Sequence, residues 1–102
     1  MDKLESLRPQ ILLSVQRALL GEISASLRGI TCEWDETKIT INCYFDGDPS
    51  ETNQESMDDV ASEVTADFPN HCVEVEYVRV DAPKALPTDP HLTWVYRRKE
   101  LI

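Results

Sequence analysis

Basic residues are absent from a forty-residue stretch in the middle of this 102-residue chain. No lysine or arginine occurs between Ile39 and Val78, whereas ten of the nineteen acidic residues fall there, and the formal net charge is −9. Concentrated negative charge repels nucleic acid and anionic membranes and attracts basic partners. The stretch therefore argues against a nucleic-acid or membrane partner and favours a basic protein. The alternative is that the acids serve only solubility.

Glycines, cysteines and long apolar runs are also scarce. The three glycines do not cluster, so the chain lacks a phosphate-binding loop. An odd count of cysteines (Cys32, Cys43 and Cys72) argues against a disulfide framework and favours a reducing, cytoplasmic location. Cys43 lies among apolar residues and is expected to pack as a small hydrophobe. No apolar run approaches the roughly 20 residues that span a bilayer, and no secretory signal is expected at the N-terminus.

What the sequence contains is the composition of one globular domain, residues 1–102, with 41% apolar and 28% charged residues. Two segments have helical periodicity. The first runs from Leu4 to about Leu20, and loosening is expected around Gly21. The second begins at a capping box formed by Thr52 and Glu55 and ends before Pro69.

Four further segments have the pattern of β-strands. Residues 38–45 alternate strictly between apolar and polar, and residues 30–34, 72–80 and 92–98 have strand-like composition. The short polar break between the first two strands indicates an antiparallel hairpin. Val78 and Val80 change phase, which indicates either a bulge or a change of environment near Tyr77. Three prolines predict an irregular loop over residues 81–90.

The order of elements is therefore helix, strand, strand, helix, strand, strand. An antiparallel four-stranded sheet can bury one face beneath two amphipathic helices. We predict this two-layer α+β sandwich, and the pattern leaves the strand order open.

Two candidate metal sites fail on spacing. The acidic turn that leads to Glu51 resembles a calcium loop, but Glu51 stands where glycine is required and Met57 stands where a distal glutamate is required. His71, Cys72 and His91 lack the spacing of a zinc site; the two histidines are better explained as surface or boundary residues, and Cys72 as a structural residue of its strand. We therefore predict no metal and no cofactor.

Catalytic and nucleic-acid-binding constellations are equally hard to find. Asp58 and Asp59 are adjacent on a predicted helix and point in different directions, so they make a poor acid/base pair. The basic run 97–99 is small for a nucleic-acid site and fits a charged edge strand or internal charge balance. These observations favour a protein that binds a partner and catalyses nothing.

Aromatic and acidic side chains supply the candidate contacts. Trp34 and Trp94 are expected to close the core beneath the helices, whereas Tyr44 lies off the apolar phase of its strand and is predicted to be an exposed anchor. The predicted partner-binding set joins this tyrosine to the acids of the turn and helix: Tyr44, Asp46, Asp48, Glu51, Glu55, Asp58, Asp59 and Glu63. The acids Glu74 and Glu76 are expected to lie on a different surface.

The chain resembles the small immunity proteins encoded beside bacterial contact-dependent growth-inhibition toxins. The resemblance covers most of the length and rests on size, acidity and the segments YFDGD at 44–48, ADFP at 66–69, VDAP at 80–83 and WVYRRKE at 94–100. It implies a cytoplasmic inhibitor that binds the C-terminal domain of its cognate toxin, commonly a nuclease with a basic cleft. The alternative is an adaptor module or a homodimer that pairs through an open sheet face or edge strand.

Overall fold

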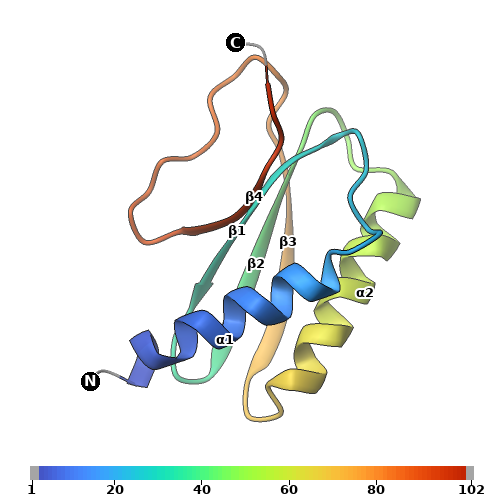
Figure 1. The fold of residues 1–102 in the computed structure, drawn as a ribbon. Coiled ribbons are helices and arrows are strands. Elements are labelled where there is room, and N and C mark those ends of the chain that lie inside the picture. The colour runs from blue at the N-terminus through green and yellow to red at the C-terminus, as the bar shows by residue number, and fades with distance from the viewer. Residues whose placement is uncertain (1–2, 101–102) are drawn as a thin grey trace.

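The computed structural model describes residues 3–100 and contains two helices and four strands within that range (Figure 1). The elements follow the predicted order and are α1 (Lys3–Ala18), β1 (Leu27–Trp34), β2 (Lys38–Phe45), α2 (Glu51–Asp67), β3 (Cys72–Arg79) and β4 (Thr93–Arg97). The strictly alternating strand β2 has the predicted bounds. Neither helix is long and apolar enough to cross a membrane.

The sheet is mixed, so the prediction of a purely antiparallel sheet is wrong. The strand order is β3-β2-β1-β4, and β2 pairs in parallel with β3, while β1 pairs antiparallel with both β2 and β4. Parallel neighbours need a crossover connection of a dozen residues or more. The 17-residue helix α2 lies in the connection between β2 and β3, so β3 can run in the same direction as β2.

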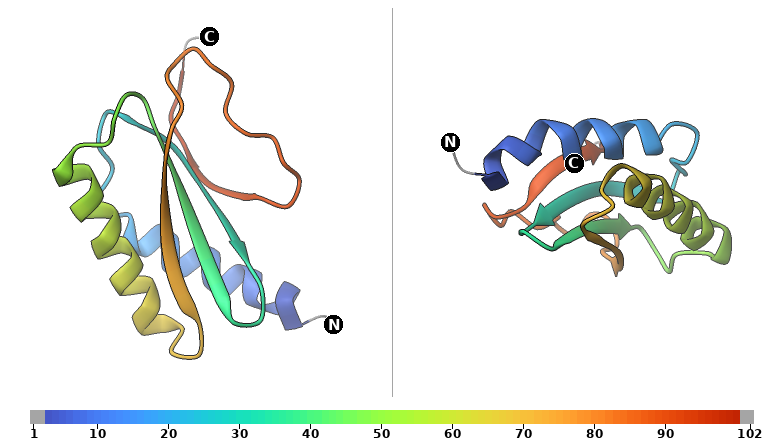
Figure 2. Two further views of the ribbon diagram at one scale, coloured as in Figure 1. Left: turned by 180° about the vertical axis from the view of Figure 1, so that it is seen from behind. Right: turned by 90° about the horizontal axis from the view of Figure 1, so that it is seen from below.

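Both helices pack on one face of the sheet, as predicted. In Figure 1 α1 crosses in front of the strands and α2 runs beside β3, and the rear view in Figure 2 shows α1 behind the strands. The main core joins apolar side chains of α1 and α2 to one side of the strands. Cys43 is fully buried there, in agreement with its predicted packing. Trp34 also packs against this core, and its indole N–H donates to the Leu4 carbonyl oxygen at 3.0 Å.

A second, smaller apolar cluster lies on the opposite face of the sheet. Tyr44 and the loop residues Val80 and Leu86 are its buried members, and Val78 and Trp94 pack against them. The loop between β3 and β4 therefore covers part of the helix-free face. The phase change at Val78 reflects this change of environment, because the pairing of β3 with β2 has no register shift.

Three local boundaries differ from the sequence prediction. Helix α1 ends at Ala18 and the chain turns at Gly21, which has a positive φ of 81°. Strand β1 begins at Leu27 and includes Gly29, whereas the predicted strand began after that glycine, at residue 30. The N-cap of α2 is Ser50, whose hydroxyl oxygen accepts the Asn53 backbone N–H at 3.0 Å, and the predicted cap at Thr52 is wrong.

Candidate functional site

An acidic ridge runs along the outer side of α2. The helix turns its apolar stripe into the core through Met57, Val60 and Val64. Residues four apart are neighbours on a helix surface, and every fourth position from the first helical residue is acidic. The ridge consists of Glu51, Glu55, Asp59, Glu63 and Asp67.

The first four side chains of this acidic ridge are solvent-exposed. Within residues 3–100, none of these four carboxylates has an ion pair or a side-chain hydrogen bond. The fifth, Asp67, accepts the Ser14 hydroxyl at 2.6 Å and pairs with Arg17 at 3.4 Å, so it joins the end of α2 to α1. The ridge therefore presents four uncompensated negative charges in a row.

The other predicted acids serve the fold. Asp46 accepts the Ala82 backbone N–H at 3.2 Å and pairs with Arg98 at 3.4 Å. Asp48 pairs with Arg79 at 2.8 Å. These contacts tie the turn after β2 to the end of β3, to the loop that follows β3 and to Arg98, which follows β4. Asp46 and Asp48 are therefore already engaged within the molecule and are weaker candidates for partner contact.

Asp58 also has an internal partner. It accepts a short hydrogen bond from the Tyr77 hydroxyl, which also donates to the Gln54 carbonyl oxygen at 3.0 Å. Desolvation, with the Asp58 carboxylate beside it, raises the pKa of Tyr77. Tyr77 therefore stays protonated, and its hydroxyl links β3 to α2.

Tyr44 is not an exposed anchor, so that prediction is wrong. Its side chain is 3% exposed, its hydroxyl lies 2.8 Å from the Thr31 hydroxyl, and its ring centroid lies 5.9 Å from that of Trp94. Burial raises the pKa of the phenol. Trp94 packs in this same cluster on the helix-free face, so the prediction that it lies under the helices is wrong as well.

The remaining acids of the cation-free stretch lie elsewhere, as expected. Glu74 and Glu76 pair in register with Thr40 and Asn42 on the helix-free face of the sheet. Glu74 forms an ion pair with Lys38 at 2.9 Å. The stretch that is continuous in sequence is thus divided between two opposite surfaces.

A buried arginine that the sequence analysis missed organises the other end of the molecule. Arg28 is 1% exposed and donates two hydrogen bonds to Glu100, from Nε to Oε2 at 2.7 Å and from Nη2 to Oε1 at 2.8 Å. Its Nη1 donates to the carbonyl oxygens of Val80 and Lys84 at 2.7 and 2.8 Å. The hydrogen bonds to Arg28, and after them those to Arg98, lower the pKa of Glu100 to about 2. The only sequence signal was an arginine inside a short apolar stretch.

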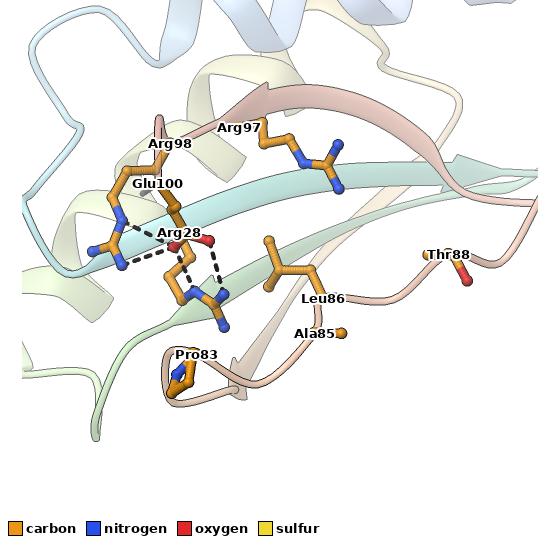
Figure 3. A pocket seen from close by; sticks show the side chains of 8 residues that line it. All are labelled: Arg28, Pro83, Ala85, Leu86, Thr88, Arg97, Arg98 and Glu100. Atoms are coloured by element: carbon orange, nitrogen blue, oxygen red, sulfur yellow. Dashed lines mark hydrogen bonds and ion pairs between the residues drawn. The ribbon is translucent and has the colours of Figure 1, made fainter. Parts of the chain in front are cut away.

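This buried cluster forms one side of a cavity of about 390 Å³ (Figure 3). Arg98 also donates to Glu100, at 2.8 Å, and Leu86 and Pro83 supply apolar lining from the loop. Arg97 stands apart from the Arg28 cluster in Figure 3. Its guanidinium carbon lies 4.7 Å from the ring centroid of Trp94.

Groups suited to catalysis or metal binding are not assembled in the described part of the chain. No three His, Cys, Asp or Glu side chains among residues 3–100 are placed to hold a metal ion. Burial raises the pKa values of the Cys32 and Cys43 thiols to about 12, which keeps both protonated and unreactive. His71 lies at the protein boundary and His91 is exposed.

The structure is a small α+β domain whose acidic ridge presents four exposed carboxylates without an ion pair among residues 3–100. The chain belongs to the MafI2 immunity protein family, which it matches over residues 8–100. It is thus an immunity protein of a polymorphic toxin system, and this confirms the resemblance at that level. No curated protein matches the chain.

Proposed function

We propose that this protein neutralises its cognate toxin by binding it in the cytoplasm, without catalysis, and that the acidic ridge of α2 is a principal contact surface. Its family supports the neutralising activity. The ridge supports the site, because its first four carboxylates are exposed and unpaired within residues 3–100. The candidate contacts are therefore narrowed to Glu51, Glu55, Asp59 and Glu63.

The ridge is electrostatically unfavourable for the isolated helix, and this favours a functional explanation over simple solubility. Each like-charge pair at i, i+4 destabilises a helix by about 0.2–0.5 kcal/mol, so three successive pairs cost roughly 1 kcal/mol. If α2 served solubility alone, lysines could alternate with the acids, because a surface of mixed charge is also soluble. A basic partner would turn the repulsion within the ridge into attraction across an interface.

The partner that fits this ridge is a protein domain with a basic cleft. A nuclease has such a cleft because it must bind the phosphate backbone of its substrate. We propose that the toxin is a nuclease delivered by contact between cells, and that the ridge covers its basic surface. Complementary charge accelerates association by orders of magnitude at low salt, which suits an inhibitor that must act quickly.

The test uses the toxin domain encoded by the neighbouring gene and two triple variants of equal charge. The first variant carries Glu55→Gln, Asp59→Asn and Glu63→Gln in the ridge. The control carries Glu5→Gln, Glu36→Gln and Glu76→Gln, which neutralises exposed acids outside α2. Both change the formal net charge from −9 to −6. Association rates are measured by stopped-flow at several salt concentrations, beside inhibition of toxin activity.

We expect the ridge variant to associate at least about 10-fold more slowly at low salt and to lose much of the salt dependence, whereas the control stays near the wild type. Equal slowing in both variants would assign the effect to net charge and remove the ridge from the interface. Failure of the wild-type protein to bind and inhibit the toxin would refute the proposed function itself.

A homodimeric module is the second candidate, and one observation favours it. Leu13, Leu20 and Ile23 are 59%, 79% and 45% exposed, and Leu20 and Ile23 line a groove of about 330 Å³ beside Val95 and Tyr96 of β4. Exposed apolar patches frequently mark interaction sites. A dimer that persists on dilution and is broken by Leu20→Glu would support this candidate, and a monomer at micromolar concentration would exclude it.

A further inference from the structure

The cavity at the C-terminal end of β4 has a charge opposite to that of the molecule as a whole. Three guanidinium groups line it, those of Arg28, Arg97 and Arg98, against the single carboxylate of Glu100. Glu100 pairs with Arg28 and Arg98, and Arg98 also pairs with Asp46. The guanidinium of Arg97 has no acidic partner among residues 3–100.

Arg97 is held in place by an aromatic surface. Its guanidinium carbon lies 4.7 Å from the ring centroid of Trp94, within the range of a cation–π contact, and its five N–H donors have no partner among residues 3–100. The planar fork of an arginine is preorganised, so less conformational entropy is lost per hydrogen bond formed. The geometry thus presents, at the cavity, a cation that has no acidic partner among the described residues.

The position of Trp94 is itself set by the absence of a side chain at Gly29. A Cβ on Gly29 would lie 2.6 Å from Cζ3 of Trp94 and 3.2 Å from the Tyr96 carbonyl oxygen, so the indole occupies the space that any other residue would fill. Tyr44 contacts the same indole with 5.9 Å between ring centroids. Gly29 therefore leaves room for the indole of Trp94, and this indole in turn contacts Arg97 at the cavity.

The other lining atoms decide which anion the cavity fits. Pro83, Ala85 and Leu86 supply apolar surface from the loop, while Thr88 adds a hydroxyl. Arginine pairs with a carboxylate through two parallel N–H···O bonds. An apolar lining favours a carboxylate carried on a short hydrocarbon stem over a fully hydrated phosphate. The volume of about 390 Å³ lies at the small end of the range for ligand pockets.

We propose that this cavity is a binding site for a carboxylate group on a short apolar stem, with Arg97 as the principal donor. The buried Arg28–Glu100 pair forms the fixed wall, and Leu86 packs against the stem. A free small carboxylic acid and the acidic side chain of a protein present the same chemical group. The proposal does not rest on the toxin-neutralising function, since it concerns a surface away from α2.

The test is a titration of the ¹⁵N-labelled protein followed by NMR. The probes are glutarate, its uncharged diamide glutaramide, inorganic phosphate, and a blocked Gly-Glu-Gly peptide. Arg97→Gln removes the proposed donor, and Lys99→Gln is the matched control because Lys99 is exposed and does not line the cavity. Thermal unfolding of both variants establishes that they are folded.

Glutarate or the peptide is expected to bind saturably in the millimolar range, with the largest shifts at the side-chain N–H groups of Arg97 and Trp94. Arg97→Gln should weaken this binding at least about 10-fold, and Lys99→Gln should leave it unchanged. Tighter binding of the peptide would identify a protein side chain as the source, and tighter binding of glutarate a free acid. Binding that is absent, equal for glutaramide, stronger for phosphate or insensitive to Arg97→Gln would overturn the assignment.

Discussion

Replacing Arg28 with methionine isolates the guanidinium head of the buried cluster while keeping most of the apolar stem. The substitution leaves the carbonyl oxygens of Val80 and Lys84 without their donor and takes the main partner from Glu100. Removal of one partner from a buried ion pair costs about 3–5 kcal/mol. Since 1 kcal/mol shifts the Tm of a domain of this size by about 4–8 °C, the Tm should fall by roughly 12–40 °C.

The matched control is Arg17→Met, which makes the same chemical change at an exposed pair. Arg17 and Asp67 are 70% and 45% exposed, so their ion pair is expected to contribute less than about 1 kcal/mol. Urea unfolding at 25 °C gives the free energy of unfolding and the m-value for both variants. If Arg28→Met loses less than 1 kcal/mol at an unchanged m-value, or no more than Arg17→Met, the reasoning about the buried cluster is refuted.

Four further predictions concern the helix cap, the strand glycine, the thiols and the loss of stability in acid. Ser50→Ala should lower the free energy of unfolding by about 1 kcal/mol, whereas Thr52→Ala should have little effect, and chemical denaturation compares them. Gly29→Ala should lower the free energy of unfolding by about 1–3 kcal/mol, because the added Cβ would meet the Tyr96 carbonyl oxygen, which cannot give way. The substitution should also alter the fluorescence of Trp94. Unchanged stability and emission would contradict the contact. Cys72 should react with a thiol reagent in the native protein, while Cys32 and Cys43 should react only on unfolding. The folded pKa of Glu100 is depressed from 4.5 to about 2, so Glu100→Gln should lose less stability than the wild type when the pH falls from about 4.5 to about 2, and unfolding of both proteins over this pH series measures the difference.

Local pattern was sufficient wherever one face of an element meets the main core. The alternation of β2 and the apolar stripe of α2 both follow from burial on one side, so their existence and approximate bounds could be predicted. The pairing of β3 could not, because parallel and antiparallel neighbours have the same alternation. What distinguishes them is the path of α2 across the sheet, which depends on packing remote in sequence.

The same limit explains the errors at the candidate site. Alternation assigns Tyr44 to the face away from the helices, but it cannot indicate that Leu86, from a loop some forty residues later, covers that face. Arg28 and its partner Glu100 are 72 positions apart, so no local window contains both. The unpaired ridge residues were found because helical spacing alone aligns them, and the engaged acids at 46, 48 and 58 were included because their partners are distant in sequence.

The core stripe and the outer ridge of α2 are under different constraints. Met57, Val60 and Val64 are buried and must remain apolar for the domain to fold, whereas the first four ridge side chains are exposed and have no ion pair or side-chain hydrogen bond within residues 3–100. Substitutions there cost little stability, so a lineage can exchange one ridge for another without rebuilding the interior. The proposed contact surface on α2 can therefore change one residue at a time while the interior of the domain stays intact.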